Sequence, residues 1–81
     1  SESVITLYPN PNNSGLLNIE STSPIKEINI FNLIGQNVFS KNCQGLMLKE
    51  SIEIDPSLNG VYFISIRLKN NMHSLKKLIL K

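Results

Sequence analysis

Short runs in which apolar and polar residues alternate recur along the chain, and each run is bounded by residues typical of turns. This period-2 pattern is rich in β-branched residues and therefore predicts strands. Helix is poorly supported, because no stretch keeps an apolar 3.6-residue period between the turn signals. Seven strands are expected, covering residues 4–8, 16–20, 25–31, 36–41, 46–54, 61–69 and 72–81.

Two of these strands have a clear inward face. In the last strand, Leu78 and Leu80 are expected to point into the core and the lysines outward. The longest strand carries its inward set on the even positions Tyr62, Ile64, Ile66 and Leu68. Seven short alternating strands in one small chain predict an all-β fold, an immunoglobulin-like antiparallel β-sandwich, with a small closed barrel as the alternative.

Two other strands are harder to orient. In the fourth, either Val38 or Phe39 could face inward. In the fifth, Leu46, Leu48, Ile52 and Ile54 share one parity, and Glu50 interrupts the set. We therefore expect a bulge or a short break near Glu50.

The turns between the strands have identifiable causes. Pro9 and Pro11 remove two backbone donors and fix two φ angles, so the first strand ends there. Asn32 to Gly35 is expected to form a tight hairpin loop in which Gly35 supplies positive φ. Gly60 permits a turn into the longest strand, where Tyr62 stands at the place of a tyrosine corner, with its hydroxyl bonded to upstream backbone.

Composition places few further limits on the fold. The chain has 81 residues, 41% of them hydrophobic, which suits one folded domain with a modest core. We expect residues 4–81 to form that domain and residues 1–3 to be the remnant of a linker from a longer protein. The 81-residue chain has a single cysteine, Cys43, which excludes a disulfide within it. No apolar run approaches the roughly 18 residues that span a membrane.

Charge is distributed unevenly. From Arg67 onward there are five basic residues and no acidic one, whereas the rest of the chain has three basic and six acidic residues. One explanation is that lysines guard a solvated edge strand against unwanted pairing. The other is that the basic end docks on a partner.

The inventory of reactive side chains does not suggest an enzyme. His73 has no second histidine or cysteine at metal-ligand spacing, and Cys43 has no evident base in the sequence around it. Glu53 and Asp55 are two residues apart on a strand and point the same way, as a pair of acid–base carboxylates could, but such a pair beside a loop is usually solvated. We therefore expect neither catalysis nor a metal or other cofactor. The basic end has no aromatic residue after Phe63, so nucleic acid is not an expected partner.

Three local patterns remain. The first is Tyr8-Pro9-Asn10-Pro11, followed by Gly15. The second is Leu58-Asn59-Gly60-Val61-Tyr62. The third is the terminal Lys76-Lys77-Leu78-Ile79-Leu80-Lys81. Taken singly, each is explained well enough by its place in a strand or turn.

In this order, the patterns resemble the type A C-terminal sorting domains of the type IX secretion system, also called the Por system. Those domains open with Tyr-Pro-Asn-Pro and a nearby glycine and end with a lysine-rich apolar strand. Their middle hairpin, Ile-x-Ile-Phe/Tyr-Asn-x-x-Gly-Gln-x-Val, is matched by Ile28 to Val38, which includes Gly35. Their Leu-x-x-Gly-x-Tyr element is matched by residues 58–62, with one residue fewer between leucine and glycine. The resemblance covers nearly the whole chain.

The resemblance implies a non-catalytic sorting signal at the end of a larger secreted protein of a Gram-negative bacterium. Its partners would be an N-terminal cargo domain, the outer-membrane translocon and a sortase-like peptidase that removes the domain. The protein would pass through the periplasm and end secreted or on the cell surface. The residues expected to be recognised are Tyr8, Pro9, Asn10, Pro11, Gly35, Gly60, Tyr62, Lys76, Lys77, Leu78, Ile79, Leu80 and Lys81.

A physical mechanism for recognition can be stated as a hypothesis. A terminal strand at a sheet edge has unpaired backbone groups, to which a receptor could add a strand, and the lysines could meet an acidic surface. The same free edge would allow a homodimer. The alternative function is a spacer or a carbohydrate-binding module of a secreted enzyme, for which only Phe31, Phe39 or Phe63 could stack on a sugar.

Overall fold

Seven strands and no helix occur in residues 4–81, the part of the chain that this computed structural model describes. The expected linker remnant, residues 1–3, lies outside the described residues. No helix in the described part is long and apolar enough to cross a membrane. The strands are β1 (Ile5–Tyr8), β2 (Leu16–Ser21), β3 (Ile25–Phe31), β4 (Asn37–Asn42), β5 (Lys49–Glu53), β6 (Gly60–Leu68) and β7 (His73–Leu80).

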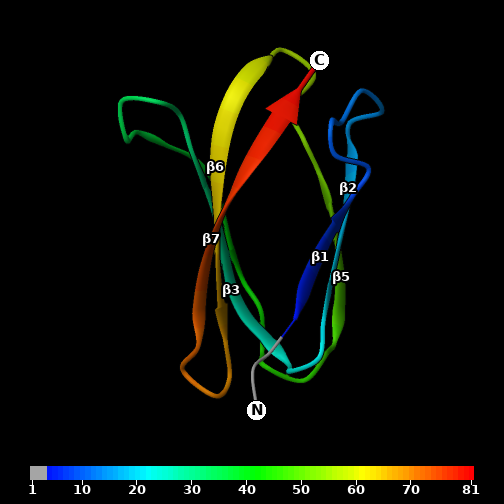
Figure 1. The fold of residues 1–81 in the computed structure, drawn as a ribbon, viewed down its shortest axis with the longest axis vertical. Helices are drawn as coiled ribbons and strands as arrows, with labels where there is room; N and C mark the ends of the chain where they lie inside the picture. Colours follow the sequence, from blue (N-terminus) through cyan, green and yellow to red (C-terminus); the bar gives the residue numbers. More distant parts are fainter. Residues whose placement is uncertain (1–3) are drawn as a thin grey trace.

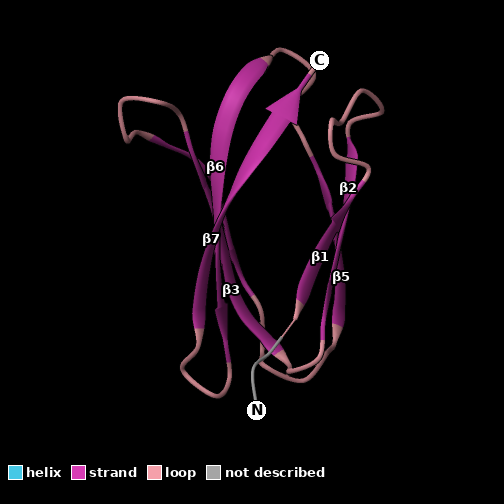
Figure 2. Ribbon diagram, in the orientation of Figure 1, coloured by secondary structure: helices cyan, strands magenta, loops and turns pink. Residues whose placement is uncertain are grey.

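The strands form two antiparallel sheets that face each other (Figures 1 and 2). One sheet has three strands in the order β1-β2-β5, and the other has four in the order β4-β3-β6-β7. The fold is therefore the expected β-sandwich and not a closed barrel. In constant-type immunoglobulin domains the fourth strand pairs with the fifth. Here β4 pairs with β3 instead and lies at one edge of the four-stranded sheet.

Aliphatic side chains from both sheets fill the space between them. Alternate residues of β2, β3, β6 and β7 point inward, because successive side chains of a strand face opposite sides of the sheet. The predicted inward residues of β6 and β7 are all buried. The core consists of Leu17, Ile19, Ile25, Ile28, Ile30, Ile52, Ile54, Tyr62, Ile64, Ile66, Leu68, Leu78 and Leu80.

The prediction for the fifth strand was wrong in two respects. The strand begins only at Lys49, so Leu46 and Leu48 lie in the preceding loop and are exposed. The pairing of β5 with β2 runs without interruption or register shift from Lys49 to Glu53, so neither a bulge nor a break occurs at Glu50. Glu50 points inward and is tolerated because its carboxylate lies 3.1 Å from the ammonium of Lys41 on β4. This ion pair joins the two sheets along one side of the sandwich.

The orientation left open for the fourth strand is settled by its register. Phe39 lies opposite the buried Ile30 and packs against the core. A register shift between Ile30 and Phe31 lets Val38 pack against the core as well. Both side chains stay half-buried, because β4 is an edge strand.

The predicted hairpin loop between β3 and β4 is confirmed. Gly35 has φ of +87° and donates its N–H to the carbonyl of Asn32 at 3.0 Å. The Asn32 side chain accepts from the N–H groups of Ile34 and Gln36. The tyrosine corner was not found: Tyr62 is buried, but the structure shows no hydrogen bond from its hydroxyl to another residue in 4–81.

Candidate recognition surface

Strand β7 forms the outer edge of the four-stranded sheet, paired on one side with β6. Leu68 donates its N–H to the Met72 carbonyl just before β7 begins, which fixes the hydrogen-bonding phase of the pair. Since antiparallel partners alternate, even residues of β7 bond to β6, and the N–H and C=O groups of odd residues point to the open edge. These edge-facing residues are His73, Leu75, Lys77, Ile79 and Lys81.

The second half of this edge is not open, because two asparagines cover it. The Asn10 side chain donates to the Lys77 carbonyl at 3.0 Å and accepts from the Ile79 N–H at 3.1 Å. The Asn12 backbone donates to the Ile79 carbonyl at 2.7 Å and accepts from the Lys81 N–H at 2.8 Å. We call Asn10 and Asn12 the asparagine clamp. The expectation that the terminal strand has unpaired edge groups therefore holds only for the part of β7 before the clamp.

Asn12 is itself held rigidly. Its side chain is 2% exposed, donates to the Leu16 carbonyl at 2.8 Å and accepts from the Gly15 N–H at 3.0 Å. Its backbone forms a parallel bridge with Leu80. The segment that leaves β1 therefore turns back against β7 before it enters β2, and Pro9 and Pro11, which end β1, lie in this turn.

The residues predicted from separate motifs meet at one end of the sandwich. Gly60 lies opposite Leu80 in the β6–β7 register, and Tyr62 lies opposite Leu78. The clamp reaches the same part of β7 from β1. In Figure 1 the C-terminus and the loops before β2, β4 and β6 all lie at this end, opposite the N-terminus.

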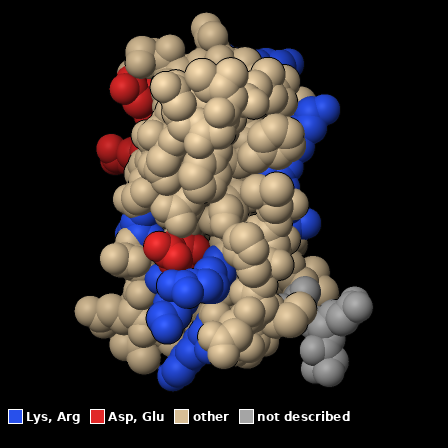
Figure 3. Space-filling model, turned by 90° about the vertical axis from the view of Figure 1, so that its left-hand side faces the viewer, with Lys and Arg blue, Asp and Glu red and all other residues tan. Residues whose placement is uncertain are grey.

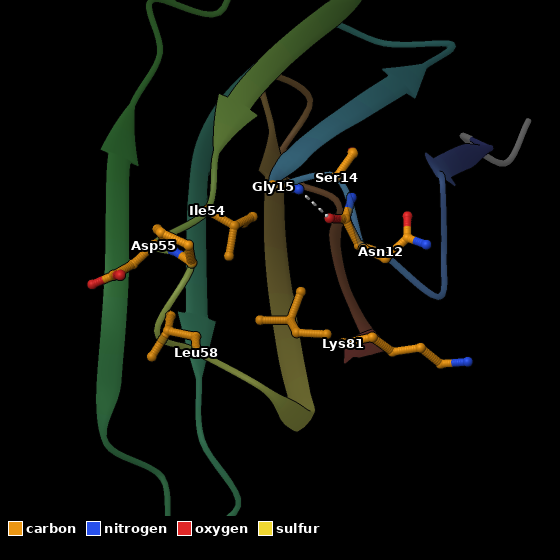
Figure 4. A pocket seen from close by; sticks show the side chains of 10 residues that line it. Asn12, Ser14, Gly15, Ile54, Asp55, Leu58 and Lys81 are labelled. Atoms are coloured by element: carbon orange, nitrogen blue, oxygen red, sulfur yellow. Dashed lines mark hydrogen bonds between the residues drawn. The ribbon is translucent and has the colours of Figure 1, made fainter.

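A pocket of about 120 Å³ opens between the two sheets at this end. Its apolar lining includes Ile54, Leu58 and Leu80. Figure 4 shows the Asn12–Gly15 hydrogen bond on one side and the charged ends of Asp55 and Lys81 pointing away from one another. The Ser57 N–H lowers the pKa of the Asp55 carboxyl by bonding to it. The pocket thus has no acid–base pair aimed into it and, in residues 4–81, no group of three or more ionisable metal ligands occurs anywhere.

Comparison with known families shows which family the chain belongs to. The family model described as "Secretion system C-terminal sorting domain" matches residues 6–81. The chain belongs to this family of type IX sorting domains. No curated protein matches it. The family is one of sorting signals attached to secreted or cell-surface proteins, as the sequence motifs implied.

The sorting domain has two outer faces of different character. The outer face of the three-stranded sheet is polar: the Tyr8 hydroxyl donates to Glu20, and Ser51 donates to Asn18 at 2.7 Å. On the outer face of the four-stranded sheet, Phe31 and Phe63 are cross-strand neighbours. Figure 3 shows that face, whose upper centre carries no charged side chain.

The loop that follows β3 lies beside the uncharged upper part of this face. Its tip residues Leu33 and Ile34 are exposed. Together with Gly60, Val61 and Tyr62 they line a shallow hollow of about 380 Å³. Gly35 thus serves the sorting domain by shaping the loop that holds this apolar tip away from the sheet. Asn32, which organises the loop, was not among the predicted site residues.

The basic end of the sorting domain is largely free of ion pairs. Arg67 pairs with Glu27 at 3.2 Å, but among residues 4–81 no carboxylate lies within 4.0 Å of the amines of Lys76, Lys77 or Lys81. In Figure 3 the charged side chains on the right-hand margin are all basic. The lysines therefore leave an uncompensated positive field beside β7.

Sequence reasoning found the motif residues of the sorting domain but missed what holds them together. Asn12 was not singled out, although it makes the central contacts of the clamp. The available signal was an asparagine three residues before Gly15, a spacing at which its side chain can bond local backbone. Nothing local could show that the same residue also contacts Ile79.

Proposed function

We propose that this sorting domain directs an N-terminal cargo protein across the outer membrane through the type IX translocon and is itself non-catalytic. The asparagine clamp carries this proposal. It joins the first family motif to the last strand, so that residues from opposite ends of the chain form one folded surface. A receptor that reads this surface would select only a folded domain.

The remaining steps of the proposal concern processing. The cargo passes through the periplasm, and after transport a sortase-like peptidase cuts in the linker near or before Ser1. The product is secreted or held on the cell surface. The domain acts in this step as a substrate.

The test is a fusion of an export signal, a folded reporter and residues 1–81, produced in a bacterium that has the type IX system. We expect the reporter outside the outer membrane, whereas the same reporter without the domain stays in the periplasm. Leu78→Asp places a charge in the core and serves as an unfolded control, which should also stay inside. Equal amounts of reporter outside the cell with and without the domain would contradict the proposal.

One observation favours the alternative of carbohydrate binding. Phe31 and Phe63 are half-buried cross-strand neighbours on the outer face of the four-stranded sheet, with Asn29 and Ser65 in the next row. Such a face could stack on a sugar ring. Phe39 is not available for this, because it packs against the core. A glycan screen of the chain beside its Phe63→Ala variant tests the alternative: binding that the variant loses would support it.

A further inference from the structure

We propose that the open half of the β7 edge, His73 to Lys77, is where a partner adds a strand, and that this partner is an acidic, extended segment. The inference rests on the proposed function and names the surface and the chemistry by which the domain is read. It moves recognition away from residues 78–81, which the structure uses for folding: Leu78 is 0% exposed and Leu80 is 3% exposed.

The backbone geometry leaves one short stretch of the β7 edge open, residues 73–77, which we call the window. The asparagine clamp takes up the edge-facing groups from the Lys77 carbonyl to the Lys81 N–H. Before that point, the N–H groups of Leu75 and Lys77 and the Leu75 carbonyl point to the same edge and have no hydrogen-bond partner within residues 4–81. A strand that docks here therefore pairs along a few residues centred on Leu75. Strand addition of this kind takes its affinity from main-chain hydrogen bonds.

The side chains around the window select the partner. Leu75 is 61% exposed and lies on the outer face, next to the apolar surface that includes Phe63. Lys77 lies on the same face, and Lys76 lies on the inner side of the edge. A docked strand with an apolar residue beside Leu75 and acidic residues beside the lysines matches each of these positions. Cross-strand pairs of opposite charge are favourable, and like charges directly opposite are not.

A second copy of the chain fits the window less well. Two β7 strands paired antiparallel about Leu75 would place Lys77 of each copy opposite His73 of the other. They would also bring four lysines, two from each copy, together along one short contact. Lysines on edge strands are known to block this kind of self-pairing. A foreign acidic strand gains from the same charges.

The decisive variant is Leu75→Pro. It removes the edge-facing N–H of Leu75 while leaving every hydrogen bond to β6 in place, and proline is tolerated on the open side of edge strands. Leu75→Ala is the matched control, since it shortens the same side chain but keeps the N–H. We expect Leu75→Pro to lower reporter export at least about five-fold relative to Leu75→Ala. Thermal melting of both chains checks that the fold is kept.

Charge is tested separately with two double variants of equal net charge. Lys76→Glu/Lys77→Glu reverses the charges at the window, and Lys26→Glu/Lys69→Glu reverses two exposed lysines elsewhere. Export should fall for the first pair and stay near the unmodified level for the second. An equal loss in both would mean that net charge matters and not the edge.

Binding is measured on the purified chain by NMR titration with a synthetic peptide of alternating glutamate and valine, and with a lysine–valine peptide as control. The acidic peptide should shift the amide signals of Leu75 and Lys77 more than those of Ile79 and Lys81, and the basic peptide should shift none of them. The inference is overturned if the two peptides act alike. It is also overturned if Leu75→Pro is exported as well as Leu75→Ala.

Two further outcomes are separable from these. A chain that is dimeric by light scattering and becomes monomeric as Leu75→Pro would make a second copy the occupant, and would overturn the acidic partner. Failure of the unmodified domain to export the reporter would instead defeat the proposed function. In that case the peptide titration still tests whether the open edge of β7 binds an acidic strand.

Discussion

The backbone N–H of Asn12 donates a 2.7 Å hydrogen bond to the carbonyl of Ile79, so the start of the chain closes the edge of its last strand. Edge strands expose rows of backbone groups, which proteins commonly cover or charge. This sorting domain does both on one strand: the asparagine clamp covers the end of β7, and lysines flank the part left open.

Amide exchange should divide β7 into these two parts. The N–H groups of Ile79 and Lys81 are hydrogen-bonded to the clamp, whereas those of Leu75 and Lys77 face solvent. Protection follows hydrogen bonding and local stability. We therefore expect slow exchange at Ile79 and fast exchange at Leu75 when the native chain is followed by NMR in D₂O. Similar rates at these two positions would mean that the clamp is not closed in solution.

Replacing Asn12 should destabilise the domain more than replacing its exposed neighbour Asn13. Asn12→Ala removes the acceptor of the Gly15 N–H and one of the two side-chain donors to the Leu16 carbonyl. A loss of about 1–3 kcal/mol in the free energy of unfolding follows for a buried polar group of this kind. Asn13→Ala should stay within about 0.5 kcal/mol. Urea denaturation of both variants measures the difference, and equal midpoints would count against the assigned role of Asn12.

Replacement by alanine should destabilise the domain strongly at one leucine of β7 and very little at another. Leu78→Ala removes a fully buried side chain and should cost about 2–5 kcal/mol of stability. Leu75→Ala removes a side chain on the open face and should cost no more than about 0.5 kcal/mol. Denaturation midpoints test this, and a large loss for Leu75→Ala would show that this residue packs in the core.

The Cys43 thiol should react slowly. Burial raises its pKa above the ordinary value, and the Glu50 carboxylate raises it further, while Lys41 opposes them. A raised pKa leaves less thiolate at a given pH, so alkylation by iodoacetamide at about pH 8 should be slower than for an unstructured thiol. The midpoint of the rate–pH profile reports this pKa.

Glu50→Gln removes the carboxylate charge that helps to raise the pKa of Cys43 and keeps the burial. The midpoint should therefore move toward the ordinary thiol value without reaching it. Glu53→Gln is the matched control, since Glu53 points to the opposite side of β5. A midpoint that both variants shift equally would remove Glu50 as the cause.

The alternation of apolar and polar residues predicted the strands well, because most core side chains come from alternate positions of the strands. In β6 the alternate residues from Tyr62 to Leu68 are all buried, and the turn signals at Pro9, Gly35 and Gly60 mark real strand ends. The packing of the strands into two sheets agrees with the sandwich that their number and length suggested. These features depend on residues close in the sequence.

What could not be predicted depends on contacts between distant residues. Glu50 faces inward because Lys41 lies across from it on another sheet, and no pattern within β5 reveals that partner. Leu46 and Leu48 have the right parity for a core strand but lie in a loop that crosses between the sheets. The clamp joins Asn10 to Lys77, and it decides which part of the terminal strand is free.

Export through the type IX translocon is the central claim. The ratio of reporter outside the outer membrane to reporter in the periplasm tests it most directly. The reporter fused to residues 1–81 is measured outside the outer membrane and in the periplasm, in a strain with the translocon and in one without it. We predict that most of the reporter lies outside in the first strain and in the periplasm in the second. The same ratio in both strains would contradict the account.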